Sequence, residues 1–221
     1  MLKCAEIASH EMAHSHYEDD ANAPLRKGKL TRKAIIEEAL HIAFHDGLEA
    51  VSFGSLAERL QMSKAGVFAH FGSMQALQTE VLRQYCVRFE ERVVYPSLSE
   101  PRGLPRLQSM FSRWARHVVE YRGNGCLYIG HAADYDERSG SMLSVLRNEA
   151  MVWRRTLEGA VRRAIKEGHL RKDTDAKQLA YEMSALIFGL HHDTWFMRDR
   201  QGKKRADRAF TKLLDGYRPA P

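Results

Sequence analysis

The sequence lacks several patterns that mark other classes of protein. Its 221 residues include three cysteines, Cys4, Cys86 and Cys126. Because their number is odd and none are closely spaced, a disulfide framework and a zinc ribbon are excluded. There is no run of about 18 apolar residues, so we expect no membrane-spanning helix. The first residues have no long apolar segment, so we expect no secretory signal and a reducing, cytoplasmic location.

Residue arrangements typical of enzymes are also missing. The sequence has no Ser-His-Asp spacing, no glycine-rich phosphate loop and no carboxylate pair, so we do not expect an enzyme. One pattern needs weighing, because His10, Glu11 and His14 fit H-E-x-x-H, in which two His bind zinc beside a Glu base. A zinc hydrolase is therefore an alternative. Against it, the segment precedes the first apolar helix, where nothing buries a metal site, and we expect no metal or other cofactor.

What the sequence does contain is an excess of positive charge, placed unevenly. The formal net charge is +6 and the isoelectric point is near 9.3, which favours a polyanionic partner. Five basic residues lie close together near residue 30 with no acidic residue among them. They are Arg26, Lys27, Lys29, Arg32 and Lys33.

Apolar residues recur with the period of a helix along the chain, and neither a strand pattern nor an internal repeat is present. The sequence therefore predicts an all-α fold. We expect a mobile tail over residues 1–25, a first helical domain over 28–88 and a second helical domain over 89–221. Pro96 is expected to end the helix that begins near Ser73.

The stretch from Val51 to Leu77 has the pattern of two short helices joined by a tight turn. Ser52 and Ser63 each stand where an N-cap is expected, just before an apolar or short polar helical segment. The second segment, 64–71, is shorter than the roughly 12–15 residues that an isolated helix needs, so its neighbours must hold it. A short helix held at an angle behind another predicts a helix-turn-helix.

The residues of this region match a known family. They are Ile35, Ile36, Ala39, Leu40, Phe44, Gly47, Val51, Ser52, Leu56, Ala57, Leu60, the run Met62–Phe68, the run His70–Ser73, Ala76 and Leu77. In these residues the chain resembles the TetR/AcrR transcriptional regulators. It departs from the family at Gly66, Phe68 and Met74, where the family usually has Thr or Ser, Tyr and Lys.

The resemblance implies a homodimeric repressor that binds a pseudo-palindromic double-stranded DNA operator and responds to a small-molecule effector. The three departures leave a further alternative open, a helical interaction module without specific DNA binding. For DNA, we expect contacts from the basic arm, the two caps and the second short helix. These residues are Arg26, Lys27, Lys29, Arg32, Ser52, Ser63, Lys64, Ala65, Gly66, Phe68 and His70.

Two further sites are expected in the second domain. The resemblance implies an effector cavity among the central helices, for which we select aromatic, His and Met residues. They are Phe89, Phe111, Trp114, Tyr128, His131, Met142 and Trp153. The helix expected over 175–198 has two apolar stripes, and one bundle needs only one of them, so the second predicts a dimer interface. Its residues, with one from the last helix, are Tyr181, Ala185, Phe188, Gly189, Trp195 and Phe210.

Overall fold

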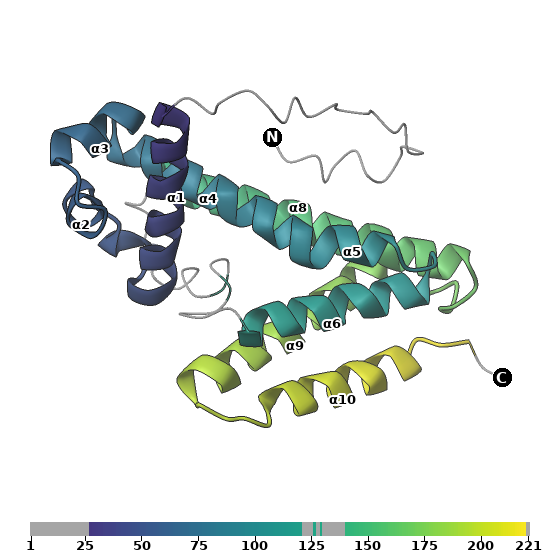
Figure 1. Ribbon diagram of the computed structural model, residues 1–221. Helices are drawn as coiled ribbons and strands as arrows, with labels where there is room; N and C mark the ends of the chain where they lie inside the picture. The colour runs from purple at the N-terminus through teal and green to yellow at the C-terminus, as the bar shows by residue number, and fades with distance from the viewer. Residues whose placement is uncertain (1–26, 121–125, 127–128, 130–139, 220–221) are drawn as a thin grey trace. The chain divides into compact units, whose positions relative to one another are not determined.

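The computed structural model describes residues 27–120, 126, 129 and 140–219. The chain divides into two compact units, Met1–Gln84 and Tyr85–Pro221. This division and the boundary that we expect after residue 88 both fall inside one helix, α4 (Met74–Phe89). The helices that surround it are shown in Figure 1.

The first unit consists of α1 and a helix-turn-helix, which continue into the first part of α4 (Figure 1). Its elements are α1 (Lys27–Asp46), a short 3-10 turn η2 (Leu48–Ala50), α2 (Phe53–Arg59) and α3 (Lys64–Phe71). α2 and α3 pack against each other, and α1 contacts both. The core of the unit holds side chains from every one of these helices, including Ile35, Leu40, Leu56, Val67 and Leu77. The predicted helix-turn-helix is therefore present.

Side chains at the start of each short helix replace the hydrogen bonds that the helix itself cannot make. Ser52 forms a capping box with Ser55, in which each hydroxyl accepts from the other residue's N–H. The Ser63 hydroxyl accepts from the N–H of Gly66 at 3.0 Å, and the Ser73 hydroxyl accepts from that of Ala76 at 3.1 Å. These three caps confirm the expected helix starts.

The helix that begins near Ser73 does not stop at Pro96. α4 passes into a π-helical turn, η3 (Glu90–Val94), and then into the short helix α5 (Tyr95–Leu98). Pro96 lies in the first turn of α5, where a missing backbone N–H leaves no helical hydrogen bond unmade. The prediction that Pro96 ends the helix was therefore wrong, because the chain starts a new helical turn just before it.

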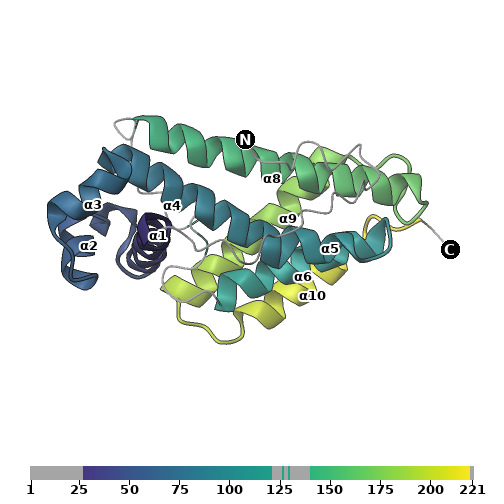
Figure 2. The ribbon, with the colours of Figure 1, turned by 45° about the horizontal axis from the view of Figure 1, so that its top comes forward.

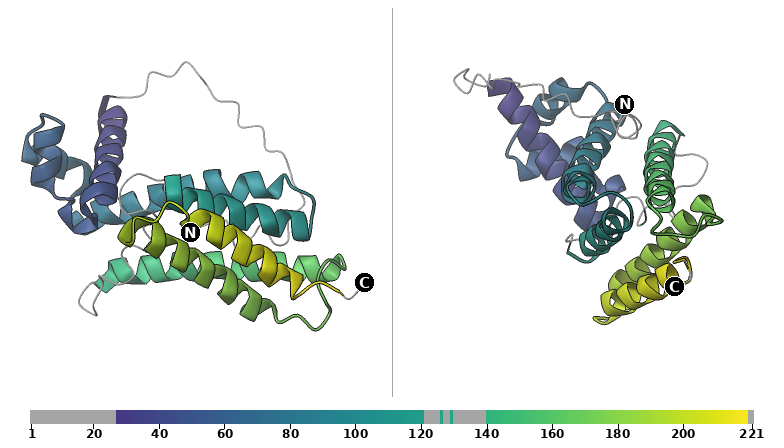
Figure 3. Two further views of the ribbon diagram at one scale, coloured as in Figure 1. Left: turned by 90° about the horizontal axis from the view of Figure 1, so that it is seen from below. Right: turned by 90° about the vertical axis from the view of Figure 1, so that its right-hand side faces the viewer.

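In the second unit, the described helices after α5 are long and pack on one another. They are α6 (Leu104–Glu120), α8 (Gly140–Lys166), α9 (Ala176–His191), a π-helical turn η5 (His192–Phe196) and α10 (Gly202–Asp215). α9 packs against α6, α8 and α10, and α10 also contacts α6. Figure 3 shows α9 and α10 side by side, and Figure 2 shows α8 meeting α9 near the turn that joins them.

Local signals set the ends of these helices. α8 ends before Gly168, which has φ 74°, a left-handed conformation that glycine adopts without strain. Asp175 starts α9 by accepting from the backbone N–H groups of Lys177 and Gln178. Gly103 precedes α6 with φ 90°, and the ring of His169 lies where a Cβ would be, 2.3 Å from its nearest atom. This position therefore accepts no other residue without displacing His169.

Two kinds of feature are absent from the described residues. None of their helices combines the length and apolar character needed to cross a membrane. Within the same residues, no three His, Cys, Asp or Glu side chains come together as a metal site would require. The pattern at His10, Glu11 and His14 lies outside the described residues.

Candidate functional site

One face of α3 is exposed and is mostly apolar. Lys64, Ala65, Phe68 and Ala69 are all exposed, while Val67 on the opposite side is fully buried. Half of the Phe68 surface is exposed, 50%. Its ring is held edge-on against Phe53 with the two centroids 5.4 Å apart. The major groove of B-DNA is wide enough to admit an α-helix. In that groove this face would offer base edges one cationic donor, Lys64, beside the fixed ring of Phe68 and the methyl groups of Ala65 and Ala69.

The caps explain two of the residues that we expected at DNA. The hydroxyls of Ser52 and Ser63 are engaged in holding α2 and α3. A Cβ at Gly66 would lie 3.0 Å from the Ser63 hydroxyl oxygen and 3.7 Å from the end of the Met62 side chain. The lack of a side chain at Gly66 thus accommodates the cap. This is a local reason for the glycine at position 66, which we expected among the residues that contact DNA.

The basic segment before the helix-turn-helix is only partly described. Arg26 and the side chain of Lys27 lie outside the described residues, and Lys29 is exposed on α1. Arg32 lies over the ring of Phe71, 4.8 Å from its centroid, and forms an ion pair with Glu80 at 3.5 Å. Arg32 therefore ties α1 to α3 and α4. His70 is half-buried beside Phe71. The contacts that we expect Arg32 and His70 to make with DNA remain predictions.

In the second unit, three of the residues that we selected for an effector come together. The rings of Phe89, Trp114 and Trp153 meet edge to face, with centroids 5.1 to 6.5 Å apart. We call them the aromatic cluster. They come from α4, α6 and α8, and all three are buried. Phe111 does not join them. Tyr128, His131 and the side chain of Met142 lie outside the described residues.

A buried histidine that we did not select lies beside this cluster. The ring of His117 is 5.3 Å from that of Phe89 and almost perpendicular to it. Its Nε2 is 3.3 Å from the hydroxyl of Tyr85, which is in turn 3.1 Å from the sulfur of Cys126. Burial lowers the pKa of His117 to about 4, and the positive charge of Arg92 adds to this. His117 is therefore neutral near pH 7.

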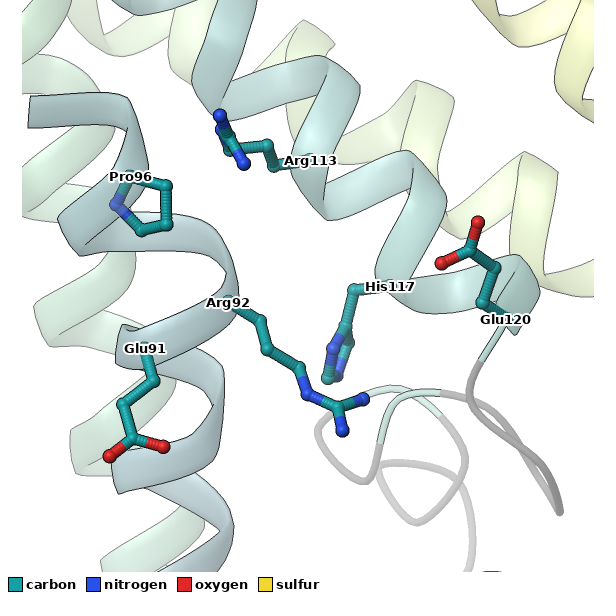
Figure 4. A pocket seen from close by; sticks show the side chains of 6 residues that line it. All are labelled: Glu91, Arg92, Pro96, Arg113, His117 and Glu120. Atoms are coloured by element: carbon teal, nitrogen blue, oxygen red, sulfur yellow. The ribbon is translucent and has the colours of Figure 1, made fainter. Parts of the chain in front are cut away.

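A hollow of about 360 Å³ opens beside His117, which is one of the residues that line it. Figure 4 shows that it lies between η3 with α5 on one side and α6 on the other. In that view Arg92 extends toward His117, while Glu91 points the other way. The residues that line it are Glu91, Arg92, Pro96, Arg113, His117 and Glu120. The volume falls in the range of small-molecule sites.

One buried and one partly buried carboxylate near the cluster were also missed. Glu90 follows Phe89 directly, is 6% exposed and accepts from the hydroxyl of Tyr95 at 2.9 Å. Glu149 lies one helical turn before Trp153, and burial raises its pKa, with a further contribution from the charge of Glu90. The only sequence signal was at Glu149, a charged residue four positions before the aromatic Trp153 on the same helix.

The predicted dimer residues divide into two groups. Tyr181, Ala185, Phe188 and Gly189 are exposed on one face of α9, and Tyr181 and Phe188 are 58% and 46% exposed. Phe196 and Met197, which we did not select, are exposed just beyond them. These exposed residues form what we call the α9 face. Such a patch is typical of surfaces that bind another protein.

Two residues predicted for the interface serve their own subunit instead. Phe210 is 6% exposed and its ring stacks on that of Phe111, with centroids 3.8 Å apart. Trp195 is half-buried and donates from its indole nitrogen to the backbone oxygen of Val118 at 2.9 Å. We correct the placement of Phe210, because a side chain packed inside its own bundle offers almost no surface to a partner.

Comparison with known proteins identifies the family. The model described as bacterial regulatory proteins, tetR family, matches residues 35–81, and the model described as tetracyclin repressor-like, C-terminal domain, matches residues 103–210. The two matches lie in the helix-turn-helix region and in the second unit. No curated protein matches the chain.

Solved structures share the fold at low sequence identity. A TetR-family regulator from Cytophaga hutchinsonii is 17% identical with a TM-score of 0.77, and the match covers 90% of this chain and all of that one. A regulator from Saccharomonospora viridis in complex with choline is 21% identical with a TM-score of 0.72, covering 84% and 96%. AibR, in complex with isovaleryl coenzyme A and operator DNA, is 19% identical with a TM-score of 0.65, covering 86% and 99%. With a family model matching in each unit, the chain belongs to the TetR family of bacterial DNA-binding transcriptional regulators.

Proposed function

We propose that this regulator is a cytoplasmic repressor that binds a pseudo-palindromic operator as a homodimer and releases it when a small molecule binds the second unit. The exposed face of α3 carries the first part of this proposal. α2 and α3 each start at a side-chain cap, and α3 presents Lys64 and Phe68, as a helix that enters the major groove requires.

The dimer is supported by the α9 face. Exposed aromatic side chains at Tyr181 and Phe188 cost free energy in water, and a two-fold contact between two α9 helices would bury both copies. The exposed Ala185 and Gly189 on the same face let two helices approach closely. A two-fold dimer carries two α3 helices, which fits an operator with two matching half-sites.

Control by a small molecule is supported by the buried cluster and the hollow in the second unit. Among the structural relatives, AibR is seen with both a coenzyme A ester and operator DNA, and the Saccharomonospora viridis regulator is seen with choline. Chemically these two ligands have little in common. The relatives therefore support a ligand in the second unit without naming it, and the ligand has to be inferred from this chain's own side chains.

The test is selection of a binding sequence from random DNA, followed by gel-shift titration at several salt concentrations. We expect a two-fold symmetric site, bound more tightly than random DNA and weakened as salt rises. Lys64→Ala should lose roughly 1–3 kcal/mol on the selected site if Lys64 contacts a base. Lys166→Ala, an exposed lysine at the end of α8, is the matched control with the same change of charge.

Equal affinity for selected and random DNA would refute the sequence-specific part of the proposal and favour the interaction-module alternative. An equal loss for Lys64→Ala on all sequences would place Lys64 at a phosphate. A selected site without two-fold symmetry would contradict the dimer.

A further inference from the structure

The aromatic cluster has the geometry of a cage corner. The interplanar angles are 89° between Phe89 and Trp114, 83° between Phe89 and Trp153, and 90° between the two tryptophans. Rings that meet at three right angles have the arrangement of the walls of a corner. The face of an aromatic ring carries negative electrostatic potential, most strongly in tryptophan, so such a corner attracts a positive charge.

Polar atoms without partners gather at the same place. Within the described residues, the indole nitrogens of Trp114 and Trp153 and the Oε2 of Glu149 are buried and make no hydrogen bond. Trp114 and Trp153 are only 3% and 6% exposed. A buried donor or acceptor without a partner destabilises the folded protein, and native proteins retain few of them. Their concentration around one cluster indicates groups that a ligand would satisfy.

Two carboxylates add negative charge beside the rings. Glu149 lies one turn before Trp153 on α8, so the two side chains are neighbours on one face. Glu90 follows Phe89, is buried, and is close enough to Glu149 to raise its pKa. Two carboxylates close enough to interact repel each other, and a cation bound between them would relieve that repulsion.

From these observations we propose that the effector is an organic cation with an alkylated nitrogen, bound at the corner of Phe89, Trp114 and Trp153 and facing Glu90 and Glu149. A hydroxyl or carboxylate elsewhere on the ligand accepts from an indole N–H. This inference rests on the proposed function, in which the second unit binds an effector, and it names the chemical class of that effector.

The surroundings supply a route and an opposing charge. His117 both contacts Phe89 and lines the hollow, so a ligand that enters through the hollow would reach the cluster past its ring. Arg92 is the cation that acts on His117, and it lies on the side of the hollow (Figure 4). The ligand's positive group is therefore placed on the carboxylate side of Phe89, and its polar end toward Arg92 and Arg113.

The experiment is calorimetric titration of the DNA-free protein with choline, with tetramethylammonium and with 3,3-dimethyl-1-butanol, which has the shape of choline but no charge. We expect saturable binding of both cations. The neutral alcohol should bind at least roughly tenfold more weakly than choline. Choline should also change the tryptophan emission, because two of the three tryptophans of the chain, Trp114 and Trp153, form the site.

Variants locate the site. Glu149→Gln keeps the size of the side chain and removes its charge, and should weaken choline about tenfold or more. Glu158→Gln is the control on the same helix, since Glu158 pairs with Arg162 at 3.4 Å and lies away from the cluster. Trp153→Phe keeps an aromatic ring of weaker potential and should weaken both cations. If circular dichroism shows that Glu149→Gln is misfolded, the Trp153→Phe variant tests the site in its place.

Equal binding of choline and the neutral alcohol, no binding of either cation at millimolar concentration, or unchanged affinity in Trp153→Phe would each overturn the inference. Because these titrations contain no DNA, they fail independently of the repressor proposal. A protein that binds its selected operator but no cation would refute only the cation. A protein that binds choline but no specific DNA would refute only the operator.

Discussion

The neutral, buried His117 should make the second unit unfold more easily in mild acid. In the unfolded chain a histidine takes up a proton near pH 6.5, whereas in the folded protein its pKa is lowered to about 4. Between these two values the unfolded state binds the proton and the folded state does not. Stability is therefore unaffected above about pH 6.5 and falls as the pH drops toward 4.

The size of the effect follows from the two pKa values. A difference between 6.5 and about 4 corresponds to about 3 kcal/mol of lost stability at the acid end, at roughly 1.4 kcal/mol per tenfold change. This is a large fraction of the roughly 5–15 kcal/mol that holds a domain together. The cause is burial first and the charge of Arg92 second.

The measurement is urea unfolding followed by tryptophan fluorescence from about pH 7.5 to pH 4.5. All three tryptophans, Trp114, Trp153 and Trp195, belong to the second unit, so the signal reports on that unit alone. His117→Gln places a neutral amide near Nε2, where it can still meet the Tyr85 hydroxyl. The difference between the two proteins removes the contribution of other titrating groups.

Wild type should lose stability relative to His117→Gln as the pH falls below about 6.5, and the two should run parallel above it. If both proteins show the same pH dependence over the whole range, His117 is not buried in its neutral form. A difference that grows as the pH rises would have the wrong sign and would refute the reasoning.

Two other predictions concern the exposed surfaces. Phe188→Glu should give a folded monomer in analytical ultracentrifugation that no longer binds the operator, because a charge would be buried twice in a two-fold contact on the α9 face; a variant that stays dimeric would move the interface elsewhere. Replacing a thymine of the selected site by uracil should weaken wild type about fourfold where Phe68 covers the methyl group, at about 0.8 kcal/mol per buried carbon, and should leave Phe68→Ala unaffected; equal losses in both proteins would show that Phe68 does not contact that base.

The sequence predicted the helices well where their ends carry local signals. Ser52 and Ser63 are caps in the structure, as predicted, because a side-chain oxygen beside the first turn is enough to start a helix. The prediction that Pro96 ends the helix was wrong because proline disrupts a helix only from an interior position. Here Pro96 lies in the first turn of the new helix α5. A π-helical turn changes the register just before Pro96, and no residue pattern announces that turn.

The sites were predictable in part. Aromatic residues such as Trp114 and Trp153 could be selected from composition alone, but their meeting at right angles depends on how three distant helices pack. Glu90 and Glu149 were missed because charged residues are normally solvated, and only tertiary packing buries Glu90 and partly buries Glu149. Phe210 was misplaced for a related reason, since an apolar stripe does not say which neighbour covers it.

The π-helical turn η3 also bears on how the length of this region can vary. The backbone N–H of Tyr95 bonds to the oxygen of Glu90, five residues back, so the turn holds one residue more than an α-helical turn does. Loss of one residue between 90 and 94 would restore the α-helical spacing without breaking the helix. In alignments of relatives, a single-residue gap should therefore fall within these five positions, and the side chains before and after it should keep their separate faces.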